Sequence, residues 1–147
     1  MQISSRFTIA MHIFAACDYF KDTQKVTSQF LAGSVNVNPV IIRKIMSQLR
    51  DAGLINVQRG TGGITLTRDP EDITLLDVFK AVDSVDDEQL FHFHENPNMN
   101  CPVGRNMHNV LDSRLDEVQK AMEDKLASMT LAEVFADTHK YADGEDS

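Results

Sequence analysis

The fold is decided by one stretch, NPVIIRKIMSQLRDAGLINVQRGTGGITLTRD, at residues 38–69. Asn38 is a good N-cap residue, and Pro39 suits the first helical position, where its missing N–H costs nothing. Apolar residues then recur at helical spacing until Gly53 ends the pattern. These are Ile42, Ile45, Met46 and Leu49. The residues left on other faces are Arg43, Lys44, Ser47 and Arg50. We therefore predict an amphipathic helix with a basic outer surface.

Two runs rich in strand-forming residues follow, at 54–57 and 64–67, with QRGTGG between them. A phosphate-binding P-loop needs the pattern G-x-x-x-x-G-K-[ST] between a strand and a helix. No Lys-Ser or Lys-Thr pair follows these glycines, and the residues after Gly63 alternate in polarity as in a strand. The glycine-rich segment is therefore predicted to be the tip of a β-hairpin, where glycine allows positive φ and close backbone approach.

Upstream, apolar residues at helical spacing predict a first helix over residues 7–17, and Thr27 can cap a short second helix that Gly33 and Asn36 interrupt. Two short helices joined by a tight turn, the second with a basic face, form a helix-turn-helix pattern. With the hairpin after it, the pattern predicts a winged helix. The fold class expected is mostly α with a small β-hairpin wing.

Downstream, Thr74 with Asp77 and Thr130 with Glu133 predict two further helix starts that use the same signal. Between them, Pro102 is expected to begin a long helix with an apolar stripe at steps of three or four. The stripe comprises Val103, Met107, Leu111, Leu115, Val118, Met122, Leu126 and Met129. Little chain remains to cover it, so we expect the helix to pack against its copy in a homodimer, chiefly through the first six of these residues.

These predictions divide the chain into four parts. A winged helix-turn-helix domain is expected at 1–83, an effector-sensing loop at 84–101, the dimerisation and C-terminal helices at 102–140, and a disordered tail at 141–147.

Charge separates the two halves of the chain. The net charge is −8, yet residues 1–68 hold eight Lys or Arg against three Asp or Glu, whereas residues 69–147 hold six against nineteen. A basic half next to an acidic half favours an anionic partner for the first half alone. The apolar run at 7–16 contains His12 and is too short to span a membrane. Two cysteines cannot form a disulfide framework, so a reducing, cytoplasmic setting is expected.

Three segments, MQISSRFTIAMH, NPVIIRKIMSQLRDAGLINVQRGTGGITLTRDPEDITLLDVFKAV and CPVGRNM, resemble the Rrf-two family of bacterial transcription regulators, the family of IscR, NsrR and CymR. The resemblance implies a dimeric winged-helix protein that binds double-stranded DNA, usually as a repressor, with a sensing loop before its dimerisation helix. Cluster-binding members carry three closely spaced cysteines in that loop. Here only Cys101 is present, so the chain resembles members without the iron–sulfur cluster, and no cofactor is expected.

The N-terminal end of the predicted recognition helix is expected to enter the major groove, with the preceding helix on a phosphate and the wing on the minor groove or backbone. The DNA-contacting residues expected are Ser28, Gln29, Asn38, Pro39, Val40, Arg43, Lys44, Arg59, Thr61, Gly62 and Gly63. The alternative is that Arg43, Lys44 and Arg50 form an ordinary solvated helix face.

Cys101 is the candidate sensing residue. Placed before Pro102, it would be a helix N-cap, where the helix dipole favours a thiolate that reacts with oxidants or electrophiles. His92 and His94 in the same loop could add positive charge. Alternatively, Cys101 only caps a helix and fills a gap.

A further alternative is a zinc site made by His92, His94 and Cys101. However, this spacing is not diagnostic, three ligands leave one position open, and no metal is assigned. Cys17 lies on the apolar face of the first helix and is expected to be buried, while His12 and His108 are expected to find local partners.

The sequence contains no nucleophile elbow, HExxH motif or Walker loop, and no enzymatic activity is expected. Two functions fit these patterns. One is a regulator that binds a palindromic operator. The other is a winged-helix module whose acidic half binds a protein partner.

Overall fold

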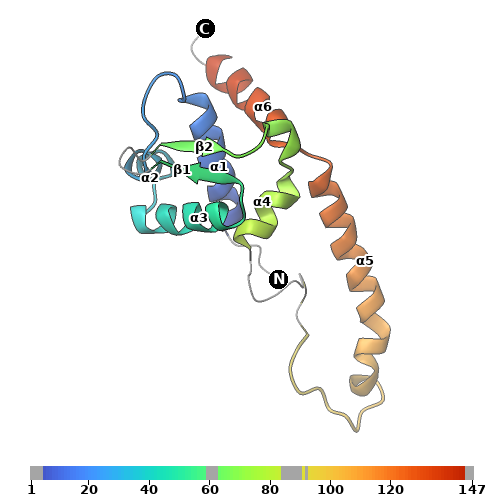
Figure 1. Ribbon diagram of the computed structural model, residues 1–147. Helices are drawn as coiled ribbons and strands as arrows, with labels where there is room; N and C mark the ends of the chain where they lie inside the picture. Colours follow the sequence, from blue (N-terminus) through green and yellow to red (C-terminus); the bar gives the residue numbers. More distant parts are fainter. Residues whose placement is uncertain (1–4, 59–62, 84–90, 92, 145–147) are drawn as a thin grey trace.

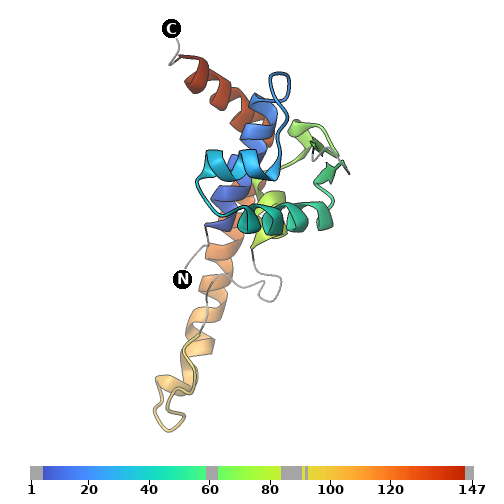
Figure 2. The same ribbon diagram turned by 90° about the vertical axis from the view of Figure 1, so that its left-hand side faces the viewer.

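The computed structural model describes residues 5–58, 63–83, 91 and 93–144. The elements in chain order are α1 (Arg6–Tyr19), α2 (Ser28–Val35), α3 (Pro39–Asp51), β1 (Ile55–Val57), β2 (Ile64–Leu66), the 3₁₀ turn η1 (Pro70–Asp72), α4 (Leu75–Val82), the 3₁₀ turn η2 (Gly104–Asn106), α5 (Met107–Ala127) and α6 (Leu131–Gly144). Helices α1 to α4 gather on one side, and α5 extends well away from them (Figures 1 and 2).

The hydrophobic core lies where α3 meets α1, α2 and α4. From α3 it takes the four residues of the predicted stripe, and Ile42 and Leu49 have no exposed surface at all. Phe14 of α1 and Leu31 of α2 are buried in the same cluster. Burying apolar side chains at this spacing fixes which face of α3 points inward, and therefore which face remains in solvent.

The local start and stop signals act as predicted. The Thr27 hydroxyl accepts a hydrogen bond from the Phe30 N–H at 3.1 Å, and the Asn38 side chain accepts one from the Val40 N–H at 2.9 Å. Asn36 ends α2 in the left-handed conformation, with φ of 64°. This sharp reversal aims α3 across α2 and completes the helix-turn-helix.

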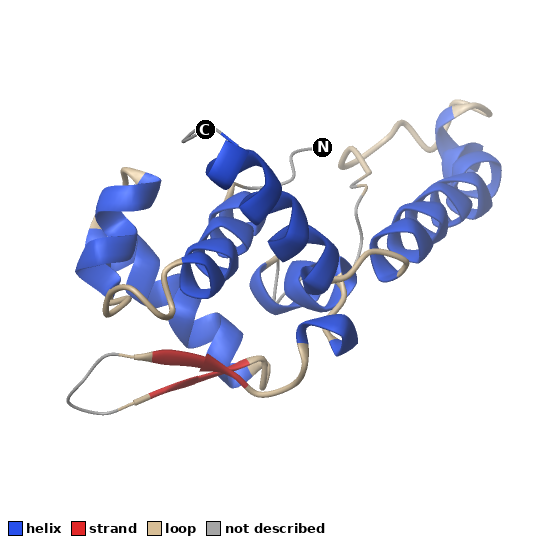
Figure 3. Cartoon of the chain, turned by 90° about the horizontal axis from the view of Figure 1, so that it is seen from above, coloured by secondary structure: helices blue, strands red, loops and turns tan. Residues whose placement is uncertain are grey.

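The predicted hairpin is present and antiparallel, with Ile55 opposite Leu66 and Val57 opposite Ile64. Beyond the last pair, the Gln58 N–H donates to the Gly63 carbonyl at 2.8 Å. Figure 3 shows the hairpin at one edge of the helical body, with α5 at the far end. The winged helix-turn-helix is therefore confirmed.

The starts of α4 and α6, at Thr74 and Thr130, are joined by hydrogen bonds, which the sequence did not indicate. Thr74 and Thr130 form an antiparallel bridge. The Leu75 N–H donates to the Met129 carbonyl at 2.9 Å, and the Leu131 N–H donates to the Ile73 carbonyl at 2.9 Å. The winged-helix body and the C-terminal helix are thus joined by backbone hydrogen bonds at both helix N-termini.

The long helix begins at Met107 and not, as predicted, at Pro102. In an α-helix the Pro102 carbonyl would accept from the backbone N–H of Asn106. Here the Asn106 side-chain amide donates to it at 2.7 Å, while the Asn106 N–H bonds the Val103 carbonyl at 3.2 Å. Asparagine competes in this way for backbone partners, so residues 102–106 form turns instead of α-helix.

The tail was also predicted wrongly in part, because α6 continues to Gly144 and residues 145–147 lie outside the described residues. The end of α6 is tied to α1. The Tyr19 hydroxyl donates to the Asp143 carboxylate at 2.9 Å, and the His139 ring lies 3.1 Å from the Asp18 carboxylate. Contacts between elements so far apart in sequence extend the helix beyond its compositional signal.

Replacing the caps at the paired helix starts should lower stability unequally. Thr74→Ala removes a complete capping box and should lower the free energy of unfolding by about 1 kcal/mol. Thr130→Ala should cost less, because its reciprocal bonds with Glu133 are both 3.4 Å long. Urea unfolding followed by circular dichroism measures both. An equal or larger loss for Thr130→Ala would contradict this order.

Candidate nucleic-acid interface and cysteine loop

The N-terminal end of α3 is an exposed surface that carries both apolar and basic side chains. Val40 is 60% exposed and Ile41 is 42% exposed. Arg43 and Lys44 are exposed one turn later. Apolar side chains placed so openly beside cations match the needs of a major-groove reader, which contacts thymine methyl groups as well as acceptor atoms. Ile41 was not predicted, although its exclusion from the core stripe was a usable signal.

A groove of about 340 Å³ lies beside this surface, between the start of α2, the side of α3 and β1. It is lined by Ser28, Arg43, Met46, Ser47, Arg50 and Val57. Ser28 and Arg43 were predicted site residues, and the structure brings them together. Ser47 and Arg50 were missed, although they follow Arg43 at helical steps of four and three. The Arg50 guanidinium donates to the Ser47 hydroxyl at 3.4 Å.

The remaining predicted DNA contacts lie at the starts of α2 and α3, at the base of the wing, or outside the described residues. Gln29 and Asn38 are exposed, and the Asn38 side chain caps α3. Pro39 occupies the first turn of α3 as predicted. Gly63 is half-buried at the base of the wing. The wing-tip residues Arg59, Thr61 and Gly62 are not among the described residues.

The apolar stripe of α5 has no buried residue within one chain. Val118 of α5 is 52% exposed, and Val103, in the turn before α5, is 64% exposed. The other predicted interface residues, Met107, Leu111, Leu115 and Met122, are half-buried. Helix α5 thus presents a continuous, incompletely covered apolar face at the end of the molecule opposite the hairpin (Figure 3).

Cys101 was predicted to be the N-cap of the long helix. This is wrong, because Cys101 lies in the turn before α5 and the N-cap of α5 is Asn106. The pKa of its thiol is nevertheless lowered, because the backbone N–H of Gly104, and then that of Val103, hydrogen-bonds the sulfur. These two N–H groups do locally what a helix N-terminus would do. A side chain on Gly104 would meet the Asn98 carbonyl oxygen at 2.6 Å, so the turn is closely packed.

The histidines and the second cysteine have separate surroundings. His94 is exposed, and His92 lies outside the described residues. His108 pairs with Asp112 one turn away at 3.1 Å, which confirms the expected local partner. His12 instead pairs with the Ser34 hydroxyl of α2 at 2.8 Å, so its partner is not local. Burial raises the pKa of the Cys17 thiol to about 12. Cys17 is half-buried against the core and not fully buried as expected, and its thiol remains protonated at neutral pH.

Comparison with known proteins assigns this arrangement to a family. The family model Rrf2, described as an iron-dependent transcriptional regulator, matches residues 3–137. The chain belongs to the Rrf2 family. The resemblance expected from the sequence is therefore confirmed, and the protein is a transcriptional regulator with a DNA-binding fold.

Relatives of this Rrf2 protein are named as regulators or DNA-binding proteins, not as enzymes. YwnA of Bacillus subtilis, a candidate helix-turn-helix transcriptional regulator, is 42% identical over 132 residues, covering 90% of this chain and 96% of YwnA. A crystal structure of a candidate DNA-binding protein is 38% identical with a TM-score of 0.72, covering 88% of this chain and 98% of that one. CymR, the global cysteine regulator of B. subtilis, shares the fold with a TM-score of 0.64 at 19% identity, over 92% of this chain and 97% of CymR.

The donor set near Cys101 does not fit the metal that the family description implies. An iron–sulfur cluster needs several thiolates, and this loop supplies a single cysteine. Among residues 5–58, 63–83, 91 and 93–144, no three His, Cys, Asp or Glu side chains gather closely enough to hold a metal ion. Within the same residues, no helix is both long and apolar enough to cross a membrane.

The two thiols should differ strongly in reactivity. Thiolate is the reactive form, so at about pH 8 Cys101 should be alkylated by iodoacetamide more than about a hundredfold faster than Cys17. The rate should rise with pH through a pKa below 9.0, the ordinary value. Mass spectrometry of alkylated peptides across a pH series gives both numbers.

Gly104→Ala tests the cause of the lowered pKa. The added Cβ should displace the turn and its N–H groups, returning the Cys101 pKa toward 9.0. Gly33→Ala is the matched control, because a Cβ there meets nothing within 4 Å. An unchanged Cys101 pKa in Gly104→Ala would rule out the two N–H groups as the cause.

Proposed function

We propose that this Rrf2 regulator binds a palindromic operator as a homodimer and represses transcription. The observation that carries the proposal is the exposed end of α3, where Val40 and Ile41 stand beside Arg43 and Lys44. An apolar pair at a helix end is costly in water unless the helix end meets a partner. The floor of a major groove, with thymine methyls between acceptor atoms, suits this mixture of side chains.

In this proposal the groove beside α3 holds the DNA backbone. Arg43 and Arg50 supply positive charge, and the hydroxyls of Ser28 and Ser47 can donate hydrogen bonds to phosphate oxygens. The wing, with Arg59, Thr61 and Gly62 at its tip, would follow the backbone or the adjacent minor groove. The acidic α5 extends away from the hairpin, so its charge does not oppose the approach of DNA (Figure 1).

Removing one of the groove's cations should weaken DNA binding and its salt dependence together. With DNA fragments retained by the purified protein, fluorescence anisotropy across a salt series gives the slope of log affinity against log salt. Arg43→Ala should reduce that slope by about 1 per subunit. Lys125→Ala, on exposed α5, is the matched control and should leave it unchanged. An equal reduction of the slope in Arg43→Ala and Lys125→Ala would mean that the groove does not contact DNA.

The incompletely covered stripe on α5 supports the homodimer. A second copy would bury Val103, Met107, Leu111, Leu115, Val118 and Met122 against its own matching residues. Such a two-fold pairing presents two reading heads in the symmetry of a palindrome.

A charge on the stripe should separate the subunits. Leu111→Glu should shift the mass measured by light scattering from twice 16.5 kDa towards 16.5 kDa, because the stripe can no longer be buried without burying a carboxylate. Ser113→Glu places the same charge on another face of α5 and should remain dimeric. A dimeric Leu111→Glu protein would place the interface elsewhere.

We also propose that Cys101 relieves repression when an electrophile modifies it. The support is its lowered pKa and its position at the turn that leads into α5. With benzoquinone, the thiolate sulfur adds to a ring carbon and the electron pair of the C=C bond moves to a carbonyl oxygen. Solvent then supplies the proton, and the ring proton shifts, leaving a hydroquinone thioether. Converting the thiolate to an uncharged thioether removes the negative charge that the Gly104 and Val103 N–H groups stabilise, which would loosen the turn before α5.

Benzoquinone treatment should therefore weaken DNA binding by the wild-type protein by about tenfold or more, a typical allosteric coupling. Cys101→Ala should bind DNA as well as the untreated wild type and should not respond. Anisotropy before and after treatment, with mass spectrometry to locate the adduct, measures this. Full DNA affinity in a wild-type protein modified at Cys101 would refute the sensing role.

A further inference from the structure

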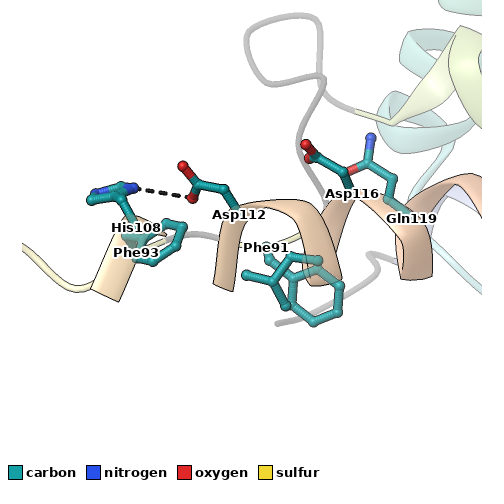
Figure 4. A pocket seen from close by; sticks show the side chains of 7 residues that line it. Phe91, Phe93, His108, Asp112, Asp116 and Gln119 are labelled. Atoms are coloured by element: carbon teal, nitrogen blue, oxygen red, sulfur yellow. Dashed lines mark hydrogen bonds and ion pairs between the residues drawn. The ribbon is translucent and has the colours of Figure 1, made fainter. Parts of the chain in front are cut away.

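A cavity of about 190 Å³ lies between α5 and the chain segment that runs beside it. The side chains around it are Phe91, Phe93, His108, Asp112, Asp116 and Gln119, with Leu115 at one edge (Figure 4). The lining residues that belong to α5 follow one another at intervals of four, three, one and three residues, so they share one helix face. Most of the predicted stripe occupies the neighbouring face, and Leu115 lies at the boundary between the two.

One wall of the cavity is aromatic. The rings of Phe93 and His108 are stacked, with centroids 3.9 Å apart and an angle of 29° between their planes. Figure 4 shows this pair at one end and Phe91 further along the helix. Phe91 and Phe93 are each half-buried. Aromatic faces carry negative potential and attract cations that have lost part of their water.

The other wall is acidic. Asp112 and Asp116 lie one turn apart, and the described lining contains no Lys or Arg. One oxygen of Asp112 is held by the His108 ring at 3.1 Å, which fixes the carboxylate in place. Two carboxylates beside two phenyl rings repel anions. A neutral ligand would leave the negative charge of the two carboxylates uncompensated. The described donors also include no trio suited to a metal ion.

We propose that this cavity binds a small organic cation, of the quaternary-ammonium or protonated-amine class. Its volume matches such a ligand, since a water molecule occupies about 30 Å³ and the cavity therefore replaces only about six. The bound cation contacts α5 directly. Any effect of the cation on DNA binding rests on the proposed function, whereas its binding to the cavity does not.

Choline and its neutral isostere 3,3-dimethylbutan-1-ol test the charge requirement directly. Both are titrated into the purified protein, and amide shifts for residues 91–93 and 108–119 are followed by NMR. Choline should bind at least about tenfold more tightly than the alcohol, from cation–π and carboxylate attraction combined. Equal affinity, or no shift with choline at these residues, would overturn the proposal.

Variants locate the site. Asp112→Asn combined with Asp116→Asn keeps the shape of both side chains and should weaken choline binding by about tenfold. Glu117→Gln removes the same kind of charge from the same helix outside the cavity lining, and it should bind choline as the wild type does. Because Asp112 also holds His108, Phe93→Leu is a second variant that keeps both carboxylates and should also weaken choline binding. Unchanged affinity in both cavity variants would overturn the assignment.

The proposed cation site and the proposed DNA-binding function can be tested independently. DNA binding is measured on the same preparations without any cation. A protein that binds DNA but not choline would overturn the cation site alone. A protein that binds choline but ignores every DNA fragment would leave the cation site standing and overturn the proposed function.

Discussion

The structure depends on the burial of one face of α3 against α1, α2 and α4. Ile42, Ile45 and Leu49 are almost wholly removed from solvent, and each contributes on the order of 1.5–3 kcal/mol through burial. Because a helix has a fixed pitch, burying these positions dictates the direction of all the others. Val40, Arg43 and Lys44 are exposed as a consequence of core packing, so the position of the proposed DNA-contacting surface is set by the core behind it.

A second constraint is the incomplete burial of α5. Its apolar stripe has no partner of sufficient size among residues 5–58, 63–83, 91 and 93–144, and the helix meets the body mainly near α4. The turn at Cys101 and the cavity beside Asp112 both adjoin this helix. Under the proposals made above, chemistry at either place would act on the element that pairs two subunits. The backbone bridge between Thr74 and Thr130 joins the C-terminal part of the chain to the winged-helix body.

Local signals made much of this fold predictable from sequence. The caps at Thr27, Asn38 and Thr74 lie within three residues of the N–H groups they satisfy, so their outcome needed no tertiary information. The start of α5 was mispredicted because the Asn106 side chain competes for the Pro102 carbonyl, and the end of α6 because Tyr19 reaches Asp143 across the fold. The cavity at Phe93 could not be anticipated, because it joins side chains from separate elements. In the groove, Ser28 and Arg43 were predicted and helical spacing pointed to Ser47 and Arg50, but the contribution of β1 through Val57 needed the tertiary structure.

The central claim is that the exposed end of α3 is the surface that contacts DNA. Site-specific photo-crosslinking tests it most directly, with p-benzoylphenylalanine placed at Val40 in one protein and at Ser113 on exposed α5 in another. With radiolabelled DNA fragments retained by the wild-type protein, the account predicts crosslinks from position 40 and none from position 113. Crosslinks from position 113 alone would contradict it.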